Sequence, residues 1–116
     1  MHKLVILIQP SEAWRKNADR WPEFSHLVEA MPGLRRETAC RVDRFLFGNA
    51  AYIQLHELFF DTLPEAEAAM TSPQGEAAGK LLQQMTGGNM VLFLAEHKED
   101  DLANIHKYRS QNEPNG

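Results

Sequence analysis

Apolar residues recur along the chain in patterns that alternate between strand and helix. Three short, nearly continuous apolar runs, at residues 3–9, 52–60 and 90–96, are typical of buried strands. Between the first two runs, large apolar residues recur every three or four positions from Trp14 to Met31, which predicts one face of a helix. Pro22 interrupts this face, because proline lacks the N–H that the helix needs. We therefore expect a kink, or two short helices.

The rest of the chain supplies one more strand and one more helical layer. Residues 34–47 mix apolar side chains with four arginines, which predicts a half-exposed strand at a sheet edge. Thr62 and Glu65 have the spacing of a capping box, so an alanine-rich helix begins there. Ser72-Pro73 restarts this helix, and Gly87-Gly88 ends it.

The predicted order of elements is strand, helix, strand, strand, helix, strand. This order is typical of a ferredoxin-like α+β sandwich (β-α-β-β-α-β), in which an antiparallel four-stranded sheet carries two helical segments on one face. The other face would still hold apolar side chains from the strands, and such a face is costly to leave in water. We therefore expect a homodimer that associates through its sheet faces.

Composition and charge limit the partners. The chain has 116 residues, of which 43% are hydrophobic and 24% charged, and this favours one globular domain, residues 1–97, followed by a polar tail, residues 98–116. A net charge of -4 argues against nucleic acid and anionic membranes as partners. The first apolar run is too short for a signal-peptide core or a membrane span. With Cys40 as the single cysteine, we expect a cytoplasmic protein.

Two adjacent residues of the strand at 52–60 are candidate catalytic groups. Glu57 is flanked on its own face by Leu55 and Phe59, and apolar surroundings disfavour a charged carboxylate, so it is a candidate general acid or base. His56 is a candidate proton shuttle on the opposite face, because side chains alternate along a strand. The alternatives are a structural glutamate in an ion pair and a histidine satisfied at an interface.

Large side chains on the first helical face are candidate ligand contacts. Trp14, Trp21 and Phe24 are hard to pack on one kinked helix without leaving space, so they are candidates to wall a cavity for a flat apolar molecule. Tyr52 and Met70 are further candidates. The alternative is plain core packing. A cavity lined by Trp21 and Glu57 would favour ligand binding, and a filled core would favour an accessory or structural protein.

No motif points to a cofactor. The glycines match neither the dinucleotide-binding fingerprint nor a P-loop, and the histidines match no recognised spacing of metal ligands. We therefore expect neither a bound cofactor nor a metal ion, so any catalysis would depend on the protein's own side chains.

Five segments of the chain match one known family in order and spacing: residues 4–10 (LVILIQP), 29–36 (EAMPGLRR), 56–62 (HELFFDT), 70–79 (MTSPQGEAAG) and 93–97 (FLAEH). Through them residues 3–97 resemble the EthD family, whose members are small dimeric α+β barrels. The resemblance implies an EthD-like protein that binds a small aromatic or alicyclic metabolite between sheet and helices. It also allows cofactor-independent chemistry of an oxidoreductase, monooxygenase-like, isomerase or cyclase kind. The alternative is a non-enzymatic ligand-binding or accessory protein of a catabolic or biosynthetic cluster. Many members carry a histidine on the first helix where this chain has Phe24.

Overall fold

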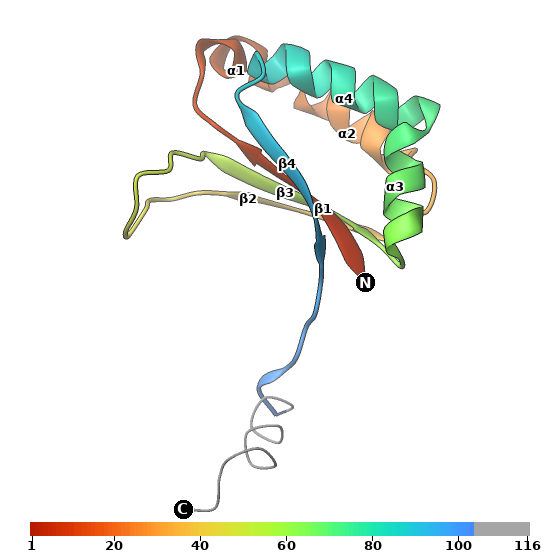
Figure 1. Cartoon of the computed structure of the whole chain (residues 1–116). Helices are drawn as coiled ribbons and strands as arrows, with labels where there is room; N and C mark the ends of the chain where they lie inside the picture. The colour runs from red at the N-terminus through yellow and green to blue at the C-terminus, as the bar shows by residue number, and fades with distance from the viewer. Residues whose placement is uncertain (104–116) are drawn as a thin grey trace, which may run out of the picture.

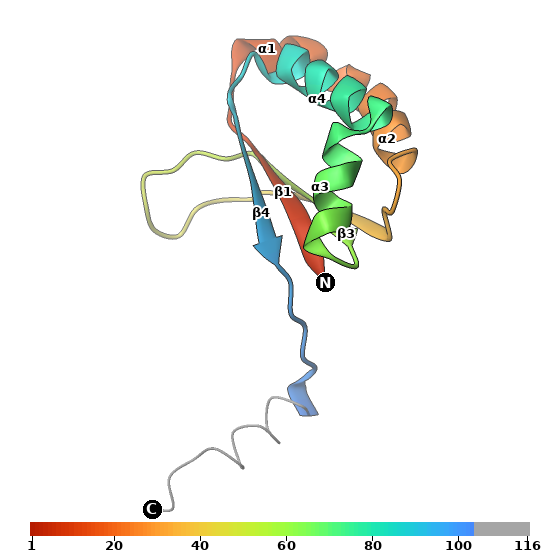
Figure 2. The same cartoon turned by 45° about the vertical axis from the view of Figure 1, so that its right-hand side comes forward.

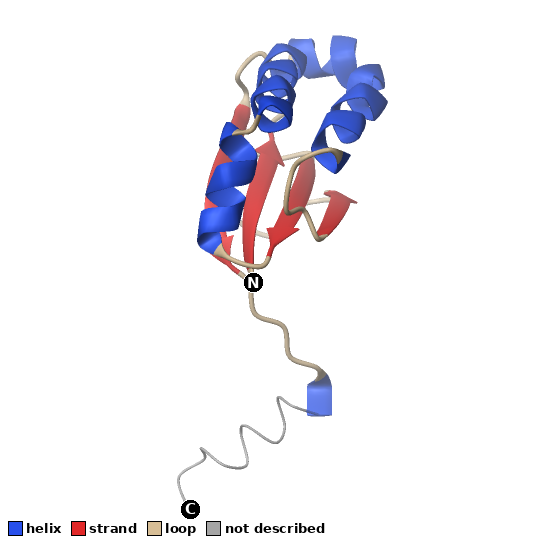
Figure 3. Cartoon of the chain, turned by 90° about the vertical axis from the view of Figure 1, so that its right-hand side faces the viewer, coloured by secondary structure: helices blue, strands red, loops and turns tan. Residues whose placement is uncertain are grey.

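Four antiparallel strands form one sheet, and the helices between residues 12 and 86 pack on the same face of it in the computed structural model (Figures 1 and 3). The structure describes residues 1–103, so most of the predicted tail lies outside the described residues. The predicted ferredoxin-like α+β fold is confirmed. In chain order the elements are β1 (His2–Ile8), α1 (Glu12–Asn17), the 3-10 turn η1 (Ala18–Arg20), α2 (Trp21–Glu29), β2 (Arg36–Arg41), β3 (Gln54–Phe60), α3 (Leu63–Thr71), α4 (Pro73–Thr86) and β4 (Met90–Glu96).

The strands lie in the order β2-β3-β1-β4, so β1 and β3 are internal and β2 is an edge strand, as predicted. In the register of β1, Ile6 lies opposite His56 of β3 on one side and Leu92 of β4 on the other. Residues that oppose each other in a sheet project to the same face. His56 therefore projects to the face that also carries Ile6 and Leu92.

The helix predicted from Trp14 to Met31 is broken, and Pro22 accounts for the break. Pro22 lies in the first turn of α2, where the missing N–H costs no hydrogen bond. A 3-10 turn joins α1 to α2, and the second helix begins at Trp21. The result is two short helices, which was one of the two predicted outcomes.

Side-chain caps fix where the helices begin. The hydroxyl oxygen of Thr62 accepts a hydrogen bond from the backbone N–H of Glu65 at 3.2 Å, and that of Ser72 accepts one from Gly75 at 3.0 Å. Gly87 ends α4 in the left-handed conformation at φ 62°. These three signals are the ones that the sequence predicted.

The strand predicted over residues 34–47 is shorter in the structure. β2 ends at Arg41, and one further ladder bond joins the Val42 N–H to the carbonyl of Ile53. Beyond it, residues 43–52 form a loop that projects from the sheet (Figure 2). Leu46 and Phe47 are 88% and 98% exposed, so no described residue packs on them to hold a strand there.

The core lies between the sheet and the helices. Its sheet side consists of alternate residues of β1 and β3, and its helix side of the buried faces of α2, α3 and α4. Fully buried large side chains include Phe24 and Val28 from α2 and Leu82 and Met85 from α4. No helix within residues 1–103 is long and apolar enough to cross a bilayer.

The opposite face of the sheet is covered in part by its own charged side chains. Phe59 is 1% exposed because the Arg36 guanidinium lies 4.2 Å from its ring centroid and the His97 ring meets it edge-on at 4.7 Å. Elsewhere on this face apolar surface remains open, and Phe93 is 44% exposed. Part of the outer sheet face is therefore exposed apolar surface, as predicted, and part is covered by side chains of the same chain.

Candidate functional site

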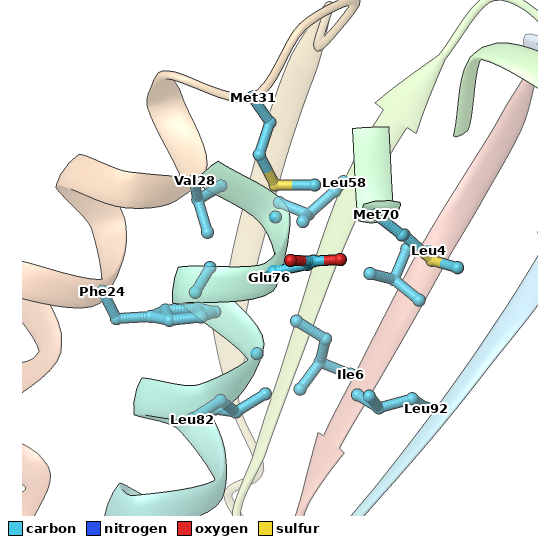
Figure 4. Close-up of a pocket in the computed structure, with 13 residues that line it drawn as sticks. Leu4, Ile6, Phe24, Val28, Met31, Leu58, Met70, Glu76, Leu82 and Leu92 are labelled. Atoms are coloured by element: carbon cyan, nitrogen blue, oxygen red, sulfur yellow. The ribbon is translucent and has the colours of Figure 1, made fainter. Parts of the chain in front are cut away.

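A cavity of about 260 Å³ lies between the sheet and the helices α2, α3 and α4 (Figure 4). Its floor is formed by alternate residues of β1, β3 and β4, and its roof by α2 and α4. Among its lining side chains a single one, that of Glu76, is charged. The lining residues are Leu4, Ile6, Phe24, Val28, Met31, Leu58, Met70, Gly75, Glu76, Ala78, Gly79, Leu82 and Leu92.

The cavity reaches the surface between α4 and the edge strand β4. Three of its lining residues, Glu76 and Gly79 on α4 and Leu92 on β4, are exposed, whereas Leu82, one turn further along α4, is 2% exposed. A Cβ atom added at Gly79 would meet no atom within 4 Å. The absent side chain of Gly79 therefore leaves the mouth open, and the Glu76 carboxylate is the polar group beside it.

His56 lies behind the wall of this cavity. Its ring meets the Trp21 ring edge-on at 5.1 Å and the Phe24 ring at 6.1 Å between centroids, and the residue is 3% exposed. Phe24 also lines the cavity, as does Ile6, which lies opposite His56 in the sheet. Burial lowers the pKa of His56 to about 4, with the charge of Glu57 acting in the opposite direction. The imidazole is therefore neutral at pH 7.

Two glutamates connect His56 with the surface. The Oε2 atom of Glu37 lies 3.3 Å from Nε2 of His56, outside hydrogen-bond geometry. Burial raises the pKa of Glu37, and so do the charge and the hydrogen bond of Glu29 at the exposed end of α2. The three side chains form a row from solvent to the buried ring, and Glu37 lies between the other two.

Glu57 lies on the opposite face of the sheet from this cavity. Its Oε2 atom forms an ion pair with the ammonium group of Lys3, and its Oε1 atom accepts a hydrogen bond from the Thr38 hydroxyl at 3.3 Å. The interpretation in which Glu57 shares a cavity with Trp21 is therefore wrong. Its geometry favours the alternative of a structural ion pair, and its assignment as an acid or base stays a prediction.

Of the other predicted ligand contacts, the structure brings two to the cavity. Phe24 and Met70 line it. Trp14 and Trp21 instead pack edge-on against each other at 5.9 Å and cover the core from outside. Tyr52 lies in the loop before β3, away from the lining. Plain core packing, the alternative that the sequence left open, therefore describes the two tryptophans.

Sequence reasoning missed Glu37, Glu76 and Gly79. The i, i+3 spacing of Glu76 and Gly79 beside Leu82 was a usable signal, since it puts both on one side of the helix. No comparable signal marks Glu37, which meets His56 only through the pairing of β2 with β3. Within residues 1–103, no group of three or more His, Cys, Asp or Glu side chains is arranged to hold a metal ion.

Comparison with known proteins shows the fold. No protein-family model matches the sequence, and no curated protein sequence matches it. Among solved structures, an EthD family protein from Bacillus halodurans C-125 is 23% identical, with a TM-score of 0.75 over 84% of this chain and 99% of that chain. A dimeric ferredoxin-like protein of unknown function from Jannaschia sp. CCS1 is 18% identical, with a TM-score of 0.62 over 83% and 97%.

A third solved structure carries a described activity. SnoaB, a cofactor-independent oxygenase from Streptomyces nogalater, is 11% identical, with a TM-score of 0.61 over 87% of this chain and 95% of that chain. At these identities the likenesses establish a common fold. The ligand and the chemistry have to be inferred from the residues of this chain.

Proposed function

We propose that this chain is an EthD-like protein that binds a small aromatic or alicyclic molecule in the cavity between its sheet and helices. The observation that carries the proposal is the lining, which is apolar in all but one side chain and opens to solvent at one end. Concave apolar sites with few polar groups are the usual form of small-molecule sites. The likeness to an EthD family protein supports the same reading.

The volume of the cavity indicates the size of the ligand. An apolar cavity of about 150 Å³ holds one benzene ring. The cavity of about 260 Å³ in this protein therefore suits a molecule of one or two rings. Glu76 at the mouth disfavours a ligand that is itself an anion, because like charges repel. A neutral molecule of one or two rings fits best.

Catalysis in this cavity would depend on side chains of the chain itself. The likeness to a cofactor-independent oxygenase favours oxidoreductase chemistry of that kind as an extension of binding. Isomerase or cyclase chemistry remains a further prediction. The alternative is a non-enzymatic ligand-binding or accessory protein, for which ligand affinity would be present without turnover. Binding is common to both readings, so it is the property to test first.

Gly79→Leu tests the binding site directly. The new side chain would enter the open mouth, where a Cβ meets no neighbour, and would occupy the space that the ligand needs. We expect the variant to fold, since leucine favours a helix over glycine. We expect its affinity for ligand to fall at least about tenfold, because the lost apolar contacts correspond to more than about 1.4 kcal/mol. NMR titration with neutral one- and two-ring compounds measures this change.

The matched control is Lys80→Leu, which adds the same side chain to the next, exposed position of α4 outside the lining. Its affinity should equal that of the unaltered protein. Two results would count against the proposal: binding of none of the compounds by the unaltered protein, and equal affinity in Gly79→Leu and Lys80→Leu.

A homodimer through the open part of the outer sheet face is a further element of the proposal. Leu7, Leu55 and Val91 remain half-buried there and Phe93 exposed, and similar structures are described as dimeric. Phe93→Asp, which places a charge on this surface, should convert a dimer into a monomer. Light scattering at micromolar concentration gives the mass. A monomer before the substitution would contradict the dimer.

A further inference from the structure

His56 presents a buried polar group that no described residue satisfies. It is 3% exposed, and neither of its ring nitrogens has a hydrogen-bond partner within residues 1–103. Buried polar side chains nearly always have such a partner, because a buried polar atom without one has lost its hydrogen bonds to water and gained none in return. An unmade bond of this kind, next to a cavity, points to a partner outside the described residues, and a bound ligand is such a partner.

The neighbours of the His56 ring indicate which of its two nitrogens is available to a ligand. Glu37 lies on the Nε2 side, at 3.3 Å, so that side of the ring already faces a carboxyl group. Nδ1 faces no polar atom that bonds to it. A neutral imidazole carries one N–H and one acceptor nitrogen, and the carboxyl group beside Nε2 favours the proton on that atom. Nδ1 is then a hydrogen-bond acceptor for which no described residue supplies a donor.

We infer that the ligand carries a hydroxyl group and that His56, through Nδ1, accepts a hydrogen bond from it at the end of the cavity closed by Phe24. This inference rests on the proposed ligand binding and names the ligand class: a neutral one- or two-ring alcohol or phenol. The Phe24 ring contacts His56 and also lines the cavity, so we place the hydroxyl of the ligand beside the edge of that ring. A hydrocarbon of the same shape leaves the nitrogen unpaired, and sites of this kind discriminate against such an analogue.

The test compares 2-naphthol with naphthalene, which differ in the hydroxyl group alone. Affinities of the unaltered protein for both are measured by NMR titration and corrected for the water–octanol partition of each compound. We expect 2-naphthol to bind about tenfold more tightly after this correction, the worth of about one hydrogen bond. In His56→Phe, which keeps a ring against Trp21 and removes both nitrogens, the ratio should fall to about one.

Control variants separate recognition by His56 from other causes. His26→Phe makes the same substitution at an exposed position of α2 and should keep the ratio of the unaltered protein. Phe24→Leu should weaken both ligands alike and preserve the ratio, because the ring of Phe24 makes no hydrogen bond. Loss of the ratio in Phe24→Leu, with His56→Phe unaffected, would assign the hydroxyl to the aromatic face and overturn the inference.

The outcomes distinguish this inference from the proposed function. If neither compound binds, ligand binding in the cavity fails and the inference fails with it. If both bind and the corrected ratio is near one, or is unchanged in His56→Phe, the proposed function stands and the role of His56 is overturned. The ratio should also be constant from pH 6 to pH 8, because the recognising ring is neutral over that range. A ratio that rises steeply toward acid would indicate a charged imidazolium and contradict the acceptor role.

Discussion

Gly75→Ala is expected to destabilise the protein by about 3 kcal/mol, near the upper end of what an overpacked position costs. A Cβ atom at Gly75 would overlap the backbone carbonyl oxygen of Ala69 and would lie 2.8 Å from that of Met70. Both oxygens belong to the backbone of α3, so neither can turn aside as a side chain would. The first turn of α4 would have to shift away from α3, and the lining of the cavity at Met70 would shift with it. Urea unfolding measures the change.

Gly79→Ala is the matched comparison, because it makes the same substitution one turn later on the same helix. There the added Cβ meets nothing within 4 Å, so the helix gains the usual advantage of alanine over glycine, about 0.5–1 kcal/mol. The two variants should therefore change stability in opposite directions. Equal stabilisation by both would show that α3 and α4 do not approach each other at Gly75 as the structure has them.

Local signals along the chain were sufficient to predict most of the fold. Thr62 and Ser72 each begin a helix through a hydrogen bond from the residue three positions on, and Pro22 fits the first turn of α2 because it has no N–H to bond, so the sequence displays all three directly. Gly75 and Gly79 are different. Both are glycines in a helix, and what separates them is the approach of α3, which depends on the angle between two helices and not on any local spacing.

The place of Glu57 relative to the cavity could not be predicted, for a comparable reason. Alternation in β3 separates Glu57 from His56, but both faces of the strand carry large apolar side chains, Leu55 and Phe59 on one and Leu58 and Phe60 on the other. The pattern therefore does not tell which face the helices cover. The answer depends on the whole sheet, where Lys3 and Thr38 bond to Glu57 while Phe24 packs on His56.

The buried imidazole predicts a loss of stability in mild acid. The pKa of His56 falls from 6.5 to about 4 on burial, so an unfolded chain takes up the proton first. The contribution of the neutral His56 ring to the free energy of unfolding is fully present above pH 6.5. It declines as the pH falls toward 4 and changes no further below that. By linkage it amounts to roughly 3 kcal/mol at its largest. Urea unfolding at intervals from pH 7 to pH 4 measures the slope of the free energy of unfolding against pH.

Other carboxyl groups act in different directions or at different pH values. The raised pKa of Glu37 works against His56, because a carboxyl that holds its proton in the folded state adds stability as the pH falls. The pKa of Glu99 is lowered to about 2 by its hydrogen bonds to His97 and Arg36, so its contribution is lost between pH 4.5 and 2, below the range of His56. The slope between pH 6.5 and 4.5 therefore combines the loss of stability from His56 with the opposing change from Glu37.

His56→Phe should flatten that slope, because the ring that must stay neutral in the core is gone. The phenyl ring keeps the edge-on contacts with Trp21 and Phe24 and leaves no buried nitrogen without a partner. At pH 5 the variant should therefore be more stable than the unaltered protein, although it lacks the proposed ligand contact. His26→Phe makes the same substitution at an exposed position of α2 and should keep the original slope. An undiminished slope in His56→Phe would mean that another group carries the acid sensitivity and that His56 is accessible to water in the folded protein.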